Sequence, residues 1–113
     1  MPVCSVGEKL IAEFLDKHYI GYDYDKQITL RGIEKNENGY DTLWCRPDFY
    51  LHEFDIIIEY WGLIGSKDYD TKMEDKKRLY KEAGRKFISI APEQLNDIET
   101  LLTSKLKMMG CNL

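Results

Sequence analysis

Hydrophobic positions recur at helical spacing near both ends of the chain. The first apolar stripe comprises Leu10, Ile11, Phe14 and Leu15. Ser5 precedes this stripe as an N-cap candidate, so the pattern predicts a helix from Ser5 to about Lys17. Near the other end, Pro92 can open a second helix. Its predicted buried side carries Leu95, Ile98, Leu101, Leu102 and Leu106.

Denser apolar runs, rich in β-branched and aromatic residues, fill the middle of the chain and predict strands. The predicted strands are the stretch from Tyr22 to Leu30, Thr42 to about Leu51, Asp55 to about Tyr60, and Phe87 to Ile90. A turn signal at Asn36–Gly39 separates the first two. A basic amphipathic helix is predicted from about Asp70 to Ala83, with Gly84 as its stop. The order α-β-β-β-α-β-α predicts an α/β sandwich in which helices flank a mixed four-stranded sheet.

Two acidic side chains interrupt the second and third predicted strands at facing positions. Only a short turn near Glu53 separates these strands, so they are predicted to form a hairpin that places Asp48 opposite Glu59. A carboxylate among isoleucines and aromatics is costly unless something offsets its charge. Two such carboxylates at facing positions can bind a hard divalent cation between them. The alternative is two strand-end acids that reach solvent or pair with Arg46.

Composition limits the class of protein. The chain has 113 residues, of which 43% are hydrophobic and 32% charged, and this predicts one globular domain over residues 1–113. No apolar run approaches the roughly 20 residues of a membrane span. The scattered cysteines, Cys4, Cys45 and Cys111, indicate neither a zinc site nor a disulfide framework. We therefore expect a cytoplasmic protein without a membrane partner.

The net charge of −4 hides an uneven distribution. Residues 67–90 carry eight basic and five acidic side chains, whereas residues 1–66 carry six basic and twelve acidic ones. An acidic site beside a basic segment suits a metal-dependent enzyme that acts on a polyanion. A solvated helix face of mixed charge is the plain alternative.

Four ordered sequence blocks resemble the PD-(D/E)XK nuclease superfamily, and more narrowly its very-short-patch-repair-like domains, which also occur attached to some superfamily I helicases. The blocks are Ser5-Val6-Gly7-Glu8, Arg46 to Leu51, Ile58 to Gly62, and Tyr69 with the lysine-rich stretch Lys76-Lys77-Arg78. The resemblance covers nearly the whole chain. It implies a restriction-endonuclease-like three-layer sandwich and a Mg²⁺-dependent DNA endonuclease or nickase, in which Mn²⁺ can substitute for Mg²⁺.

The resemblance also implies roles for individual residues. Asp48, Glu59 and the carbonyl group of Tyr60 would bind the metal ion, and Glu8 would complete the acidic cluster or hold a metal-bound water. The Ser5-x-x-Glu8 spacing is also a capping box, which alone explains that acid. Because the chain is short and lacks an obvious target-recognition domain, we expect it to act on DNA as a homodimer or as a subunit of a larger DNA-processing complex.

One position departs from the superfamily pattern. Trp61 stands where a lysine is expected, two residues after Glu59, and it cannot contact a phosphate as an ammonium group does. The predicted basic helix offers replacements, because one stripe along it carries Tyr69, Lys72, Lys76 and Tyr80. Lys72 and Lys76 are the catalytic candidates, with Lys76 favoured. DNA contacts are expected from Lys72, Lys76, Lys77 and Tyr69, and a DNA groove can also be lined by Tyr60 and Tyr80.

Two other functions fit the sequence. The first is a nuclease-fold module that has lost catalysis with Trp61 and binds nucleic acid or a partner protein without cutting. The second is an unrelated α/β interaction protein, which leaves the placement of Asp48 and Glu59 unexplained.

Overall fold

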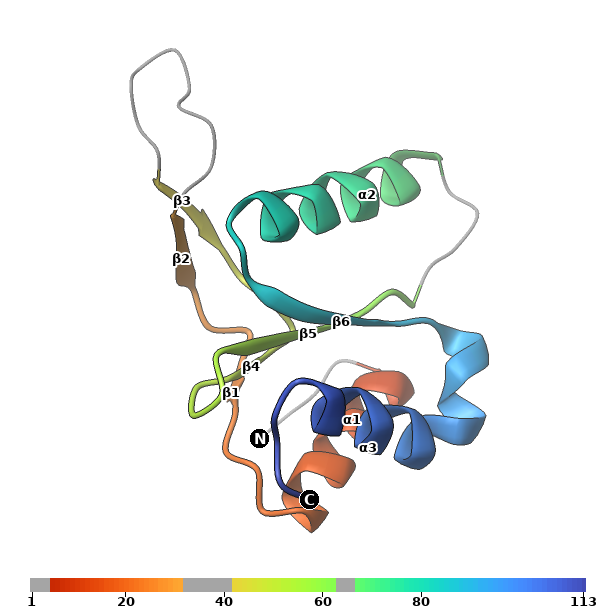
Figure 1. Ribbon diagram of the computed structural model, residues 1–113. Helices are drawn as coiled ribbons and strands as arrows, with labels where there is room; N and C mark the ends of the chain where they lie inside the picture. The colour runs from red at the N-terminus through yellow and green to blue at the C-terminus, as the bar shows by residue number, and fades with distance from the viewer. Residues whose placement is uncertain (1–4, 32–41, 63–66) are drawn as a thin grey trace.

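The computed structural model describes residues 5–31, 42–62 and 67–113 (Figure 1). The elements in chain order are α1 (Val6–Lys17), β1 (Asp23–Tyr24), β2 (Ile28–Arg31), β3 (Thr42–Cys45), β4 (Phe49–Leu51), β5 (Ile56–Tyr60), α2 (Lys67–Glu82), β6 (Lys86–Ile90), a 3₁₀ segment (Pro92–Asp97) and α3 (Ile98–Met108). The predicted turn at Asn36–Gly39 and the residue Cys4 lie outside the described residues.

A mixed four-stranded sheet has the strand order β1-β4-β5-β6. The first two pairings are antiparallel, and β5 pairs with β6 in parallel, because α2 carries the chain across between them. Helices α1 and α3 lie on one face of the sheet and α2 lies on the other (Figure 1). The predicted mixed four-stranded sheet flanked by helices is therefore confirmed.

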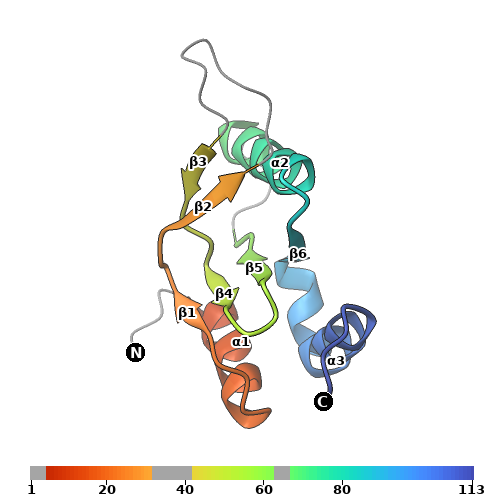
Figure 2. The same ribbon diagram turned by 60° about the vertical axis from the view of Figure 1, so that its left-hand side comes forward.

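Two of the predicted strands are wrong as continuous elements, because each is broken into two. The stretch from Tyr22 to Leu30 is divided into β1 and β2 around Asp25, whose φ of +53° turns the chain away from an extended path. The stretch from Thr42 to Leu51 is divided into β3 and β4 at Arg46–Pro47, where proline lacks the N–H that a sheet needs. The strands β2 and β3, which are separated from β1 and β4 by these breaks, pair with each other in a two-stranded antiparallel sheet near α2 (Figure 2).

The hydrophobic core has two parts. The larger part fills the space between the sheet and the helices α1 and α3, and it includes the predicted stripe residues Ile11, Phe14, Leu15, Leu102 and Leu106. The other three predicted positions of the C-terminal stripe, Leu95, Ile98 and Leu101, are partly buried against this cluster. The smaller part lies on the α2 side and centres on Ile57 and Tyr80. The two apolar stripes therefore face the sheet as predicted, except that Leu10 is half-buried and lies outside the cluster. The segment from Pro92 begins as a 3₁₀ turn and becomes α-helical only at Ile98.

The helix ends follow local signals. Ser5 caps α1 by accepting the backbone N–H of Glu8 at 3.1 Å, as predicted. Gly84 follows α2 with a φ of +68°, a conformation that favours glycine at a helix end. In the described part of the chain, no helix combines the length and apolar character needed to cross a bilayer.

Candidate metal and nucleic-acid site

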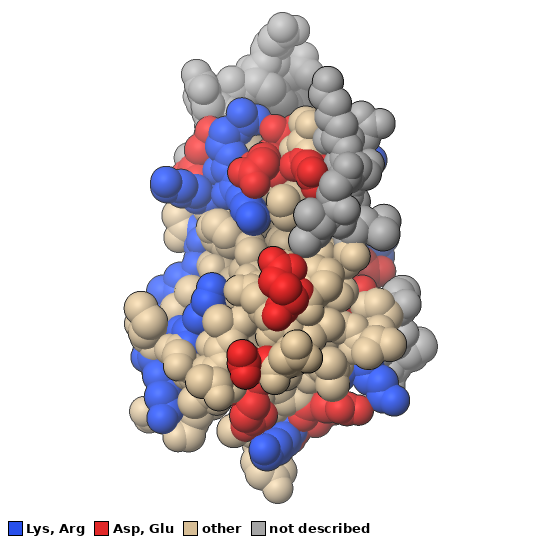
Figure 3. Space-filling view, turned by 90° about the vertical axis from the view of Figure 1, so that its right-hand side faces the viewer, with Lys and Arg blue, Asp and Glu red and all other residues tan. Residues whose placement is uncertain are grey.

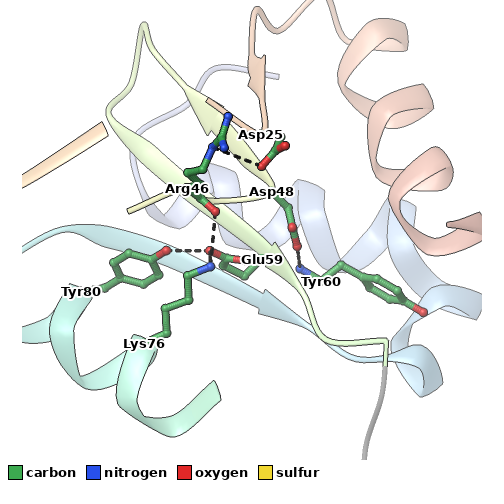
Figure 4. Close-up of polar contacts among 7 residues, drawn as sticks. All are labelled: Asp25, Arg46, Asp48, Glu59, Tyr60, Lys76 and Tyr80. Carbon is green, nitrogen blue, oxygen red and sulfur yellow. Dashed lines mark hydrogen bonds and ion pairs between the residues drawn. The ribbon is translucent and has the colours of Figure 1, made fainter. Parts of the chain in front are cut away.

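The hairpin β4–β5 brings Asp48 and Glu59 together. The observed register pairs Phe49 with Ile58 and Tyr50 with Ile57, so one further step places Asp48 opposite Glu59. This confirms the predicted hairpin register. Asp48 is held at two points. Its Oδ2 accepts the backbone N–H of Tyr60 at 2.7 Å (Figure 4), and its carbonyl oxygen accepts the N–H of Asp25 at 3.1 Å.

Glu59 is buried, with 2% of its surface exposed, and α2 supplies its polar partners. The Tyr80 hydroxyl donates to Oε1 at 2.6 Å, and the Lys76 ammonium contacts the same oxygen at 2.8 Å. Lys76 and Tyr80 are four residues apart on α2 and therefore lie on one face of the helix. Lys76 also donates to the carbonyl oxygen of Arg46 at 3.4 Å, which ties α2 to the segment that precedes Asp48 (Figure 4).

Burial and like charge set the ionisation of the pair. Burial first, and then the negative charge of Glu59, raise the pKa of Asp48 to about 7, while the Tyr60 N–H and Lys76 oppose the rise. Burial and the charge of Glu59 also raise the pKa of Tyr80, so its hydroxyl stays protonated as a donor. Two carboxylates face one ammonium group here, and the excess negative charge is what a bound cation would offset.

The residues that follow Glu59 point to different sides of the sheet. Trp61 is 7% exposed, and its ring centroid lies 5.8 Å from the Lys76 ammonium. Trp61 therefore lies on the same side as Glu59, as the alternation of side chains along an extended chain requires. Tyr60 points away from the pair (Figure 4), and α1 passes so close to its ring that a Cβ on Gly7 would lie 2.2 Å from the Tyr60 Cζ atom.

Glu8 does not join the acid pair in the structure. Its carboxylate accepts a hydrogen bond from the Tyr24 hydroxyl, and it also faces the Ser5 hydroxyl at 3.5 Å as part of the helix cap. Within the three described ranges, no three acidic, cysteine or histidine side chains lie close enough together to hold a metal ion. The Ser5 half of the predicted capping box is therefore formed, whereas the Glu8 carboxylate contacts Tyr24 and the Ser5 hydroxyl. Among the described residues, the predicted three-carboxylate cluster is not formed.

The other predicted DNA-contacting residues differ in placement. Lys72 is exposed on α2, whereas Lys77 is half-buried with its ammonium 3.9 Å from Glu74. Tyr69 belongs to α2, but its side chain falls outside the described part. Tyr80 is fully buried against Glu59, so the prediction that it lines a DNA groove is wrong.

The sequence did not identify Tyr80 as the hydrogen-bond donor to Glu59. The available signal was its position on the same helical stripe as Lys76, which fixes the side of α2 that faces the sheet.

Charged side chains are segregated on the side of the molecule where β5 and β6 end. Figure 3 shows this face with acidic side chains down its middle and basic side chains along its left margin.

Comparisons of the chain with protein-family models, with curated proteins and with solved structures found no match.

Proposed function

We propose that this protein is a metal-dependent DNA endonuclease or nickase with a restriction-endonuclease-like three-layer sandwich fold. The observation that carries the proposal is the contact of Lys76 with Glu59, which lies opposite Asp48 on the hairpin. Two acids and one lysine thus meet at one end of the inner strands β4 and β5. Lys76 approaches from α2 and takes the place of the lysine that the superfamily pattern has at the position of Trp61, directly after β5.

The donor set suits a hard divalent cation such as Mg²⁺ or Mn²⁺. Asp48, Glu59 and the carbonyl group of Tyr60 would hold the ion, with Oδ2 of Asp48 and Oε1 of Glu59 already bound to protein groups. Burial and then repulsion by Glu59 raise the pKa of Asp48 to about 7, and a cation there would offset both effects. When bound, it would lower the pKa of a coordinated water and polarise the scissile phosphate.

The remaining roles belong to side chains of α2. Lys76 orients the attacking water and stabilises negative charge that develops on the phosphate oxygens. Tyr80 positions Glu59 through its hydrogen bond and does not touch the substrate. Lys72 and Lys77 contribute positive charge along the path of the DNA backbone.

A cleavage assay tests this proposal. Supercoiled plasmid, single-stranded DNA and branched DNA are incubated with Mg²⁺, Mn²⁺ or EDTA, and wild type is compared with Asp48→Asn. The exposed residue Asp97, at the start of α3 and without a side-chain cap bond, gives the matched control Asp97→Asn. We expect metal-dependent cleavage that Asp48→Asn reduces at least about 100-fold and Asp97→Asn leaves unchanged. Full activity of Asp48→Asn would refute the assignment.

A catalytically inactive module is the second candidate. It is favoured by Trp61 at the usual lysine position and by the engagement of Lys76 with both Glu59 and the Arg46 carbonyl. Such an inactive module would bind nucleic acid or a partner protein through the same end of strands β4 and β5. Metal-independent DNA binding without cleavage of any of the three substrates would support it over the nuclease.

A further inference from the structure

A cavity of about 330 Å³ lies where β5 and β6 end, beside the candidate site. Its apolar lining comes from Trp61, from Met73 on α2 and from Ala91 after β6. The volume is at the lower end of the roughly 300–1,000 Å³ that pockets for small organic ligands occupy. In α/β sheets, ligands also bind outside the carboxyl ends of parallel strands, which is where this cavity lies.

A buried polar atom in the cavity lining points independently to a ligand. Ser89 lines the cavity, and its Oγ is buried without a hydrogen-bond partner in the part of the chain that the structure describes. A buried hydroxyl without a partner is unfavourable, so rotation of the Ser89 side chain toward the cavity would let a polar atom of a ligand satisfy it. Gln94 also lines the cavity, and its Oε1 is fixed by the N–H of Ala91 at 2.8 Å, so its amide NH₂ group is a further donor.

The charges of the lining favour an uncharged occupant. Lys77 and Glu93 contribute one positive and one negative side chain, and the Lys77 ammonium also lies 3.9 Å from Glu74. A phosphate group inside the cavity would meet the Glu93 carboxylate, which opposes the attraction of Lys77. Apolar walls with hydrogen-bonding groups of both kinds suit a flat heteroaromatic ring with donors and acceptors on its edge.

The cavity is adjacent to the acid pair. Glu59 and Ser89 are register partners on β5 and β6, and neighbouring strands lie about 4.8 Å apart. Trp61 connects the cavity with the acid pair, since it lines the cavity and its ring lies beside the Lys76 ammonium. A nucleotide whose phosphate lies at the acid pair can therefore extend its base into the cavity.

We infer that the cavity receives one unstacked nucleobase of the strand whose backbone lies at the Asp48–Glu59 pair. Trp61 and Met73 contact the base, and Ser89 with Gln94 hydrogen-bonds its edge. This inference rests on the proposed function only in taking nucleic acid as the ligand. It does not require catalysis.

Binding measurements in Ca²⁺, a hard cation that can occupy the carboxylate pair, test the inference, and electrophoresis of the same samples checks that the strand stays intact. A short single-stranded oligodeoxynucleotide is compared with its abasic counterpart, which has the same backbone and charge. We expect wild type to bind the intact strand about tenfold more tightly, as loss of one stacked base predicts. Ser89→Leu fills the cavity and should abolish this preference, whereas Ser104→Leu at an exposed position of α3 should keep it.

A second cavity-filling variant guards against misfolding. If Ser89→Leu fails to fold, Ala91→Leu fills the cavity from another wall and should give the same result. A preference that survives in the folded cavity-filling variants would overturn the inference, as would equal binding of intact and abasic strands by wild type. Failure of wild type to bind either strand would overturn it too.

A free nucleoside monophosphate distinguishes a base within a strand from a free nucleotide. We expect it to compete only at concentrations far above those of the oligonucleotide. Equal competition would overturn the assignment to a strand. Cleavage by a protein that binds intact and abasic strands equally would contradict this inference but not the proposed nuclease. A preference for the intact strand without cleavage would contradict the nuclease but not the binding of a base in the cavity.

Discussion

At the scale of single residues, the placement of Glu59 among three isoleucines is explained by two partners from a distant helix. Tyr80 and Lys76 both contact its Oε1 atom, so a carboxylate that is 2% exposed keeps its hydrogen bonds and an opposite charge. The sequence marked Glu59 and Lys76 through an acid in an apolar run and a basic helical stripe. It could not show that Tyr80 turns inward, because that depends on how α2 rotates against the sheet.

Removal of the Lys76 charge should destabilise the fold. In Lys76→Met, Glu59 stays buried beside Asp48 without an ammonium group. The loss of one partner of a buried ion pair costs about 3–5 kcal/mol, and the 30% exposure of Lys76 reduces our expectation to about 2 kcal/mol. Urea unfolding at neutral pH measures the effect. The matched variant Lys72→Met, at an exposed position of the same helix, should change stability by less than about 0.5 kcal/mol. Equal effects of the two variants would contradict this account.

Asp48 should make stability depend on pH. Its pKa is about 7 in the folded protein, against about 3.9 in an unfolded chain. The unfolded state therefore loses its proton first, and stability falls as pH rises from about 4 to 7. Asp48→Asn cannot lose this proton and keeps an oxygen for the Tyr60 N–H.

The variant should gain about 1–2 kcal/mol relative to wild type when the pH is raised from 5 to 8 in EDTA, after allowance for partial solvent screening. Thermal unfolding at both pH values measures this gain. Asp97→Asn serves as the control, and a pH-independent effect of Asp48→Asn would refute the assignment.

At the scale of elements, one helix and one hairpin fix the geometry of the site. The hairpin register followed from the sequence, because the turn is short and the apolar residues alternate between two buried faces. The strand breaks near Asp25 and at Arg46–Pro47 could not be predicted from the sequence, because the residues on both sides of each break have a composition typical of strands. Which half joins which sheet depends on long-range pairing of β1 with β4 and β2 with β3.

The contact of α1 with β5 should not tolerate a side chain at Gly7. A Cβ there would lie 2.2 Å from the Tyr60 Cζ atom, so Gly7→Ala must displace either the ring or the helix. We expect a loss of about 2 kcal/mol, as for other overpacked cores. Glu13→Ala, at an exposed position of the same helix, is the control. In a double-mutant cycle measured by denaturant unfolding, Tyr60→Leu should relieve most of the loss. Additive effects would show that Gly7 acts elsewhere.

At the scale of the whole molecule, the features that depend on local sequence could be predicted, and those that depend on long-range packing could not. Helix caps, apolar stripes and the hairpin were local, and the mixed four-stranded sheet between helices followed from their order. Glu8 was misplaced because its alternative partner, Tyr24, comes from an edge strand whose position the sequence did not reveal. The cavity beside Ser89 was equally hidden, because α2, β6 and the 3₁₀ segment contribute to it together.

The central claim is that Asp48 and Glu59 share one divalent cation, and calorimetric titration with Mn²⁺ tests it most directly. We predict that wild type and Asp97→Asn bind about one ion per chain, and that Asp48→Asn binds at least about tenfold more weakly. At a hundredfold excess of metal over the dissociation constant, linkage should stabilise wild type by about 2.7 kcal/mol. Absence of Mn²⁺ binding by wild type, or equal affinity in Asp48→Asn, would contradict the claim.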